Sequence, residues 1–191
     1  MKSGVVTVID KTAQFLRAID GLVGTRVMVG VPSEKALRTD GSDGPNNATL
    51  AYIHEHGAPE ANIPARPFLA PGIERAKGDT VALLRVAGEK ALDGNPAAVE
   101  RQLHRVGLLN QASVRSVITE GIPPPLAEST IAGRIRRVKG AKRQAKIAAE
   151  LAAGTPASRQ GGEEGLFVPL VRTGQLRNSI TYVLRKVGKK S

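Results

Sequence analysis

Three closely spaced prolines, Pro59, Pro64 and Pro67, limit what this chain can fold into more than any other local feature. Each proline fixes its own φ angle, removes a backbone donor and pushes the preceding residue into extended backbone. The segment can therefore be neither a helix interior nor a central strand. Residues 48–56, just before it, allow about two helical turns. Gly57 suits the end of that helix, because glycine adopts left-handed backbone at little cost.

A short apolar anchor follows the prolines. Phe68 and Leu69 are its apolar part, and each is worth roughly 1.5–3 kcal/mol if fully buried. The flanking prolines lower the entropy of the unfolded segment, so a fixed geometry costs less to form. Arg66 could make a bidentate pair with a carboxylate, either that of Glu55 or one on a neighbouring subunit. The pattern favours a core anchor at the start of a long helix.

Hydrophobic periodicity predicts the remaining elements. We expect helices over residues 6–20, 72–92 and 97–119, partial helix over 126–151, a helical turn over 173–179, and strands over 26–31 and 180–184. The first helix carries an apolar stripe of Val8, Phe15, Leu16 and Ile19. The third carries Val99, Leu103, Val106, either Leu109 or Asn110, and Val114. In the helix over 48–56, the side chains expected to turn inward are Leu50, Ile53 and Tyr52.

Composition sets the fold class. Aromatic residues make up 3% of the chain, and both Trp and Cys are absent. The core must therefore be aliphatic, and neither a disulfide nor a thiolate metal site is available. No run approaches the roughly 18 apolar residues of a membrane helix, and no signal peptide is recognisable. We expect a soluble α+β protein with a small, mostly antiparallel sheet, long helices and an extended basic arm.

The positive charge is concentrated in the last third of the chain. Residues 1–121 hold 14 Lys and Arg against 13 Asp and Glu, whereas residues 122–191 hold 14 against 4. The shift coincides with the stiff run Pro123-Pro124-Pro125, the best candidate linker. We therefore predict a near-neutral α+β body over 1–121. A Pro-linked basic helical arm over 122–191 would return to the body through a C-terminal strand.

Within the arm, residues 134–146 contain seven bases and no acid. The seven are Arg134, Arg136, Arg137, Lys139, Lys142, Arg143 and Lys146. Contacts between such residues and phosphates give affinity without sequence readout. No aromatic residue is interleaved, which disfavours base stacking on single strands. Three interpretations stay open: a surface for an acidic protein or a channel lumen, a non-specific DNA contact, and a solvated arm.

The residues that carry enzymatic chemistry do not form a recognisable pattern. His54-Glu55-His56 lacks the i, i+4 histidine spacing of helical zinc sites, and on a helix the two histidines point about 200° apart. His104 has no acidic neighbours that would complete a site. Phosphate-binding glycine motifs and the nucleophile elbow are missing. We therefore predict no catalytic, cofactor-binding or metal-binding residues and no enzyme activity.

In order along the chain, several motifs resemble the tail-completion, or neck, proteins of long-tailed bacteriophages, also described as minor tail components. They are Val29-Gly30-Val31, the run from Leu50 to Gly57, the run from Ile63 to Leu69, Pro123-Pro124-Pro125-Leu126 with the basic segment, and the run from Leu170 to Ile180. The resemblance covers residues 26–92 and 122–184. His56 stands where many relatives carry an aromatic residue.

The resemblance implies a non-enzymatic virion protein. It would complete the head-proximal end of the tail and join it to the head, as a ring around the DNA channel with six-fold symmetry expected. Its partners would be itself, a head-side connector or adaptor, a tail terminator or tail tube, and packaged DNA. Assembly would take place in the host cytoplasm. The alternatives are a non-specific DNA-binding protein and another neck component, such as a head-completion adaptor or tail terminator.

The same resemblance assigns residues to roles. The basic segment would face the DNA channel or an acidic partner. The expected structural anchor or interface residues are Tyr52, His54, Glu55, Gly57, Pro64, Arg66, Pro67, Phe68, Leu69, Thr173, Gly174, Leu176, Arg177 and Ser179.

Overall fold

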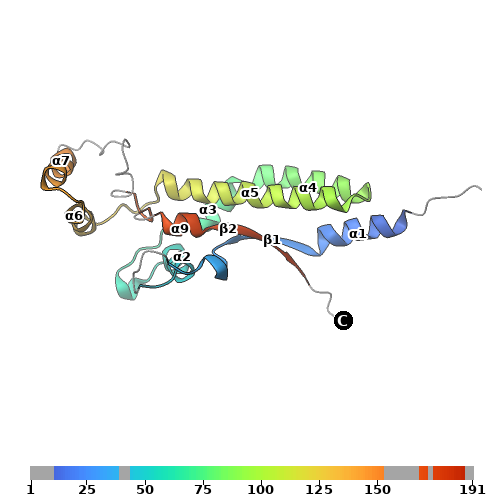
Figure 1. Cartoon of the computed structure of the whole chain (residues 1–191), viewed down its shortest axis with the longest axis horizontal. Coiled ribbons are helices and arrows are strands. Elements are labelled where there is room, and N and C mark those ends of the chain that lie inside the picture. The colour runs from blue at the N-terminus through green and yellow to red at the C-terminus, as the bar shows by residue number, and fades with distance from the viewer. Residues whose placement is uncertain (1–10, 39–43, 153–167, 172–173, 188–191) are drawn as a thin grey trace, which may run out of the picture. The chain divides into compact units, whose positions relative to one another are not determined.

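The computed structural model describes residues 11–38, 44–152, 168–171 and 174–187 (Figure 1). Its helices are α1 (Thr12–Val23), α2 (Asn47–His56), α3 (Leu69–Arg75), α4 (Lys77–Leu92), α5 (Pro96–Glu120), α6 (Glu128–Arg136), α7 (Ala141–Ala152) and α9 (Gln175–Ser179). The strands are β1 (Thr25–Gly30) and β2 (Thr181–Lys186), and two 3₁₀ turns cover Ser33–Lys35 and Pro59–Ala61. The predicted residues 6–10 and Thr173 lie outside the described part.

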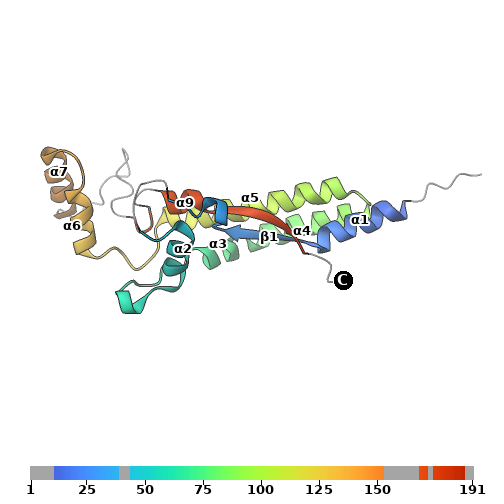
Figure 2. The same ribbon diagram turned by 60° about the horizontal axis from the view of Figure 1, so that its bottom comes forward.

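The α+β prediction is confirmed. β1 and β2 form a two-stranded antiparallel sheet, and Val187 N–H extends the pairing by donating to the Gly24 carbonyl at 2.7 Å. Both strands are rich in β-branched and other large side chains, which suit a pleated surface. Figure 2 shows the two strands as neighbouring ribbons.

Contacts divide the chain into two compact units that interleave along the sequence. The first unit comprises Met1–Val29, Ala76–Asn110 and Tyr182–Ser191, and the second comprises Gly30–Arg75 and Gln111–Thr181. The grouping therefore differs from the predicted body over 1–121 and arm over 122–191. The change in charge and the proline run are local properties, whereas α5 continues from one unit into the other and β2 pairs with a strand far away in sequence.

The first unit has a small aliphatic core. Ala18 of α1, Ala91 of α4, and Val99 and Leu103 of α5 are buried there. Half-buried side chains pack against them, and these are Ile19, Leu22, Val27 and Leu184. The apolar stripe predicted for α5 is confirmed, since Val99, Leu103, Val106, Asn110 and Val114 are all buried along the helix.

Asn110, His104 and Tyr182 make further side-chain contacts within this unit. Buried Asn110 donates from Nδ2 to the Thr80 hydroxyl at 2.7 Å and to the Val106 carbonyl at 2.9 Å. The ring of Tyr182 lies on Gly107, where an added Cβ would overlap the ring. His104 Nδ1 and the Tyr182 hydroxyl are 3.0 Å apart. Because Gly107 has no side chain, the ring of Tyr182 can pack directly against α5.

Two predictions about the first helices are wrong in detail. In α1, Leu16 is 56% exposed and Phe15 is also exposed, while Ala18 is the buried residue. The helix therefore packs Ala18, together with half-buried Ile19 and Leu22, on the core and leaves Phe15 and Leu16 exposed. The single helix predicted over 72–92 is two helices, α3 and α4, which meet at Ala76. Ala76 is buried, and the nearest residue of low helix propensity is Gly78, two positions later.

The second unit packs around the second half of α5. Gly72 of α3 meets the backbone of Val114, so closely that a Cβ on Gly72 would lie 2.6 Å from Val114 Cα. Ser113 Oγ donates to the Gly72 carbonyl at 2.7 Å. Arg115 donates to the carbonyl of Ile180 from both Nε and Nη2, at 3.1 and 2.6 Å. These bonds fix α3 and the C-terminal segment on α5.

Candidate functional site

Helix α2 has defined ends that follow from its sequence. The side chain of Asn46 caps its start by accepting from Thr49 N–H at 2.8 Å. Its end at Gly57 is as predicted, with a positive φ of 79° and a hydrogen bond from Gly57 N–H to the Ile53 carbonyl at 2.7 Å. A Cβ at Gly57 would lie 2.8 Å from Ala65 N. This close approach turns the chain directly into the proline-rich segment.

Glu55 caps the start of α3. Its carboxylate accepts from the N–H groups of Phe68, Leu69 and Ala70, at 2.8, 2.9 and 3.1 Å. The next residue, Pro71, has no N–H to satisfy. A helix N-terminus has unpaired N–H donors and a partial positive charge. One carboxylate accepts from the donors and interacts favourably with the charge. Helix α2 therefore positions α3 through a single side chain.

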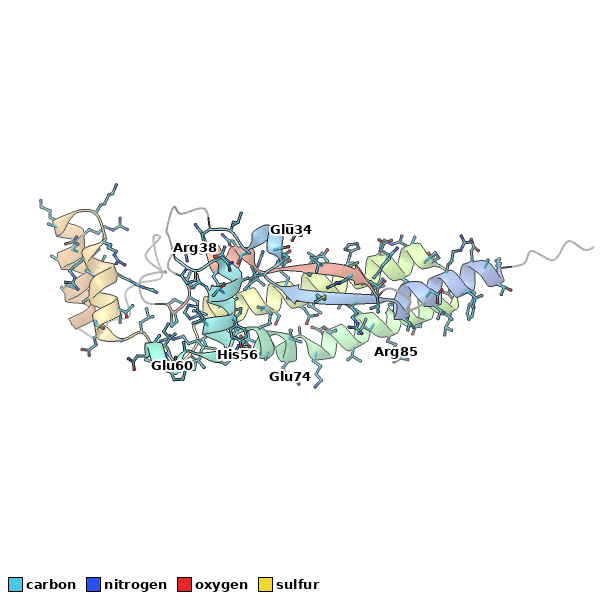
Figure 3. The ribbon with its side chains drawn as sticks, turned by 90° about the horizontal axis from the view of Figure 1, so that it is seen from below. Glu34, Arg38, His56, Glu60, Glu74 and Arg85 are labelled. Carbon is cyan, nitrogen blue, oxygen red and sulfur yellow. The ribbon has the colours of Figure 1, made fainter. Side chains whose placement is uncertain are left out.

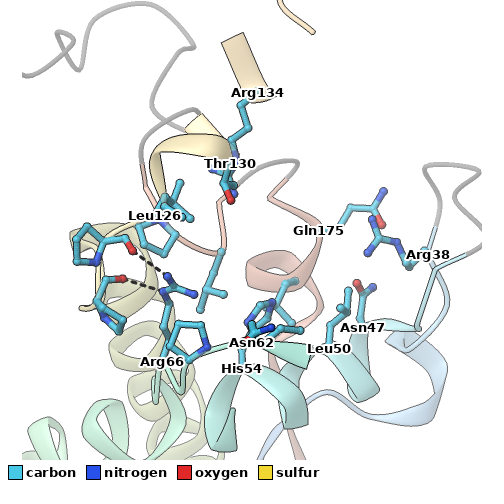
Figure 4. A pocket seen from close by; sticks show the side chains of 18 residues that line it. Arg38, Asn47, Leu50, His54, Asn62, Arg66, Leu126, Thr130, Arg134 and Gln175 are labelled. Atoms are coloured by element: carbon cyan, nitrogen blue, oxygen red, sulfur yellow. Dashed lines mark hydrogen bonds between the residues drawn. The ribbon is translucent and has the colours of Figure 1, made fainter. Parts of the chain in front are cut away.

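Arg66 is buried and binds backbone carbonyls. Its Nε donates to the Pro124 carbonyl at 2.9 Å and its Nη2 to the Pro125 carbonyl at 3.0 Å (Figure 4). The predicted pairing of Arg66 with Glu55 is therefore wrong, since that carboxylate caps α3. The planar guanidinium matches two carbonyls presented in succession by a proline run, in which no backbone N–H competes. Arg66 thus joins the proline-rich segment to the linker.

Phe68, whose N–H donates to Glu55, is 2% exposed. The predicted anchor is therefore confirmed for Phe68, whereas Leu69 is only half-buried and Pro64 and Pro67 are exposed. The anchor precedes the short helix α3.

A cavity of about 600 Å³ lies beside α2 in the second unit. Asn47, Leu50 and His54 line it from α2, at the i, i+3 and i+7 positions that share one face of a helix. Figure 4 shows Leu126 and Thr130 on the opposite side. The remaining lining residues are Arg38, Asn62, Ile63, Pro64, Arg66, Pro124, Pro125, Ala127, Arg134, Pro169, Leu170, Gln175 and Leu176.

The two histidines of α2 have different surroundings. His54 is half-buried and lines the cavity. His56 is exposed (Figure 3). Its ring stacks on that of Tyr52, with the ring centroids 4.4 Å apart. Tyr52 is 67% exposed, so the prediction that it turns inward is wrong, whereas Leu50 and Ile53 are partly buried. Because Tyr52 and His56 are an i, i+4 pair, they stack along the outer face of the helix.

Two polar atoms at the cavity have no partner. Among the side chains that the structure describes, only Asn47 Oδ1 and His54 Nδ1 are buried nitrogen or oxygen atoms without a hydrogen bond. Asn47 is 3% exposed, and its Nδ2 donates to the carbonyls of Lys35 and Leu37 at 3.4 and 3.3 Å. Burial and, secondly, the charge of Arg66 lower the pKa of His54. His54 is therefore neutral near pH 7.

This pKa shift predicts acid sensitivity. The unfolded chain takes up the proton of His54 first, so stability should fall as pH drops below about 6.5 and level off below the folded pKa. Urea unfolding from about pH 8 to about pH 5 measures this dependence. We expect His54→Gln to flatten it and His56→Gln to retain it. Identical pH profiles for the wild type and His54→Gln would contradict the assignment.

The C-terminal motif lies on α9 and its approach. Gly174 is buried with a φ of 68° at the start of the helix. Leu176 and Ser179 are buried, and Ser179 Oγ donates to the Leu176 carbonyl at 2.7 Å. Arg177 is half-buried. Leu176 also lines the cavity, so α9 brings part of this motif to the same site as the α2 motif.

The basic segment forms a helical hairpin of α6 and α7, not one helix. Gln144 holds the turn by donating from Nε2 to the Val138 carbonyl at 2.7 Å, and Ile147 is 1% exposed. Arg134 is half-buried, lines the cavity and donates to the Val168 carbonyl at 3.2 Å. The six exposed bases are Arg136, Arg137, Lys139, Lys142, Arg143 and Lys146.

Sequence reasoning missed two parts of the site. The first is Asn47, whose signal was available, because Asn46 as the helix cap leaves Asn47 on the same face as Leu50 and His54. The second is the pair of Pro124 and Pro125 carbonyls as acceptors for Arg66. Because these acceptors are backbone groups far from Arg66 in the sequence, no residue pattern predicts them.

Comparison with family models, with curated proteins and with solved structures finds no match. Within the described residues, no cluster of three or more His, Cys, Asp or Glu could hold a metal ion. The described helices include none with the length and apolar character needed to cross a membrane.

Proposed function

We propose that this protein is a structural component of the neck of a long-tailed bacteriophage. It would complete the head-proximal end of the tail and join it to the head, as a ring around the DNA channel. The motifs from Leu50 to Leu69 and from Leu170 to Ile180 support the proposal by their resemblance. The observation that carries it is the exposed apolar surface of the first unit.

That surface consists of aliphatic side chains that a single chain leaves exposed. On α4, Val81, Leu84 and Leu92 recur on one side of the helix, and Val81 is 60% exposed. On α1, Leu16 and Val23 are exposed in the same way. Exposed apolar side chains that recur along one side of a helix mark a candidate interaction site. A head-to-tail interface between copies that closes on itself would cover it and produce a ring.

Mass photometry tests the assembly directly, with the purified protein alone and then mixed with tail tubes that lack their upper end. We expect rings, and density at one end of each tube. A monomer that does not associate with tubes would contradict the proposal. Capping of isolated head connectors in place of tubes would indicate a head-completion adaptor, and capping of tubes that still fail to join heads would indicate a tail terminator.

Charge reversal of the hairpin tests its part in this function. Replacing Arg136, Arg137 and Lys139 with Glu should give folded protein, because all three side chains are exposed. We expect head–tail joining to fail, since the variant presents negative charge to DNA phosphates or to an acidic partner. Infectious particles are counted after complementation with the variant, and circular dichroism checks folding. If the variant gives as many infectious particles as the wild type, the hairpin has no role in head–tail joining.

The second candidate function is non-specific binding of duplex DNA, favoured by the α6–α7 hairpin. Two short helices joined by a turn that contains Gly140 present six exposed bases, and Lys142, Arg143 and Lys146 share one face of α7. Phosphate contacts lose affinity steeply with salt. A monomer that binds duplex DNA with such a salt dependence, and forms no rings, would favour this function.

A further inference from the structure

We propose that the cavity beside α2 binds an extended peptide segment of a partner protein, in which a carboxylate lies next to an apolar side chain. The site belongs to the second unit alone and does not depend on the neck assignment. Its components are unsatisfied polar atoms, apolar walls and charged side chains that, among the described lining residues, are all positive.

The unsatisfied atoms indicate a ligand. Asn47 Oδ1 and His54 Nδ1 are the two buried side-chain polar atoms without a partner in the described part of the chain, and both residues line this cavity. A buried polar group without a hydrogen bond destabilises a fold, so such groups are rare in native proteins. The orientation of the Asn47 amide is fixed, because its Nδ2 faces two carbonyls. Its Oδ1 therefore requires a donor, such as a peptide N–H.

The separation of the two atoms indicates an elongated ligand. Asn47 and His54 are seven positions apart on α2, which is about 10 Å along the helix axis. That distance matches about three residues of extended chain, whose backbone offers donors and acceptors along its length. A single ion could satisfy only one of the two atoms. Neutral His54 can either donate or accept, depending on its tautomer.

The charges around the cavity indicate a carboxylate. Arg38, Arg66 and Arg134 line it, and no Asp or Glu is among the described residues of its lining. Arg66 uses two of its five N–H donors on the Pro124 and Pro125 carbonyls. The guanidinium fork can therefore hold the linker and still offer donors to a ligand. A neutral His54 avoids adding a fourth positive charge beside Arg66.

The walls favour a peptide over a nucleic acid. Apolar as well as polar side chains line the cavity, and the apolar ones include Leu50, Ile63, Leu126, Leu170 and Leu176. No Phe, Tyr or Trp is among the lining residues that the structure describes, so these offer no ring on which a base could stack. Proline-rich, leucine-lined walls suit an extended chain that places apolar side chains between charged ones.

Fluorescence anisotropy of a short fluorescein-labelled peptide of alternating Leu and Glu tests the proposal with the full chain. We expect saturable binding, and binding about tenfold weaker for a twin peptide with Gln in place of each Glu. Unlabelled duplex DNA should not displace the peptide. No saturable binding, equal binding of the Gln twin, or displacement by DNA would each overturn the proposal.

The variant His54→Leu separates binding from folding. We expect a higher melting temperature, because an unsatisfied polar group is removed, together with affinity for the Glu peptide reduced about tenfold. The matched control, His56→Leu, changes the exposed side of the same helix and should keep the wild-type affinity. Thr130→Trp, at an exposed position lining the cavity, should weaken binding without altering α2.

Wild-type affinity in both His54→Leu and Thr130→Trp would overturn the proposal. Because the assay needs neither tubes nor rings, its failure would leave the neck assignment standing. A protein that forms no rings would likewise leave the peptide site intact.

Discussion

Replacing Phe68 with alanine should lower the free energy of unfolding by about 3–5 kcal/mol. Phe68 is 2% exposed, and in this unit it is the one aromatic side chain that is buried within the described residues. The neighbouring residues are held by the Glu55 cap and by the Arg66 bonds to the linker. Because these contacts restrain the surroundings, the cavity left by the ring cannot collapse, and the loss should lie high in the usual range.

Urea denaturation followed by circular dichroism measures the change. Phe15→Ala is the matched control, because Phe15 is exposed on α1 and its truncation should cost less than about 1 kcal/mol. A loss below about 1 kcal/mol for Phe68→Ala would place the ring at a surface or interface.

The second large effect is expected at Glu55. Glu55→Ala leaves the N–H groups of Phe68, Leu69 and Ala70 without their acceptor and removes a negative charge from the start of α3. We expect a loss of about 2–3 kcal/mol, from the sum of a lost cap and a charge-assisted bond. Glu55→Gln should lose less, because one amide oxygen still accepts.

The measurement is again the free energy of unfolding in urea. Glu60→Ala is the control, since Glu60 is an exposed acid in the 3₁₀ turn and should change stability by no more than about 0.5 kcal/mol. Equal small losses at Glu55 and Glu60 would show that water replaces the cap without cost.

Local patterns predicted a large part of this fold. The end of α2 at Gly57 followed from a glycine before prolines, and the buried stripe of α5 followed from helical spacing. The strands β1 and β2 were predicted to within two residues, because β-branched residues mark both. Phe68 was identified as an anchor from its place beside fixed prolines. In each case the sequence signal itself lies within a few neighbouring residues.

Predictions that depended on distant partners were wrong or were not made. Glu55 was one expected carboxylate partner of Arg66, but within the chain the acceptors of Arg66 are carbonyls of the linker. The interruption at Ala76 was not predicted. Tyr52 and Leu16 were expected to face inward, but both are exposed. Periodicity identifies an apolar face and does not say whether the covering surface belongs to the same chain.

The order in which the sheet closes has a consequence for synthesis. β1 leaves the ribosome before its partner β2, which follows only after the intervening helices have emerged. Contacts of such long sequence separation form slowly, because the intervening chain must first be ordered. During translation β1 therefore has both of its edges unpaired, in the conformation most prone to aggregation. Thr25 and Arg26, at the start of β1, are polar and charged, and they disfavour aggregation of the strand before β2 pairs with it.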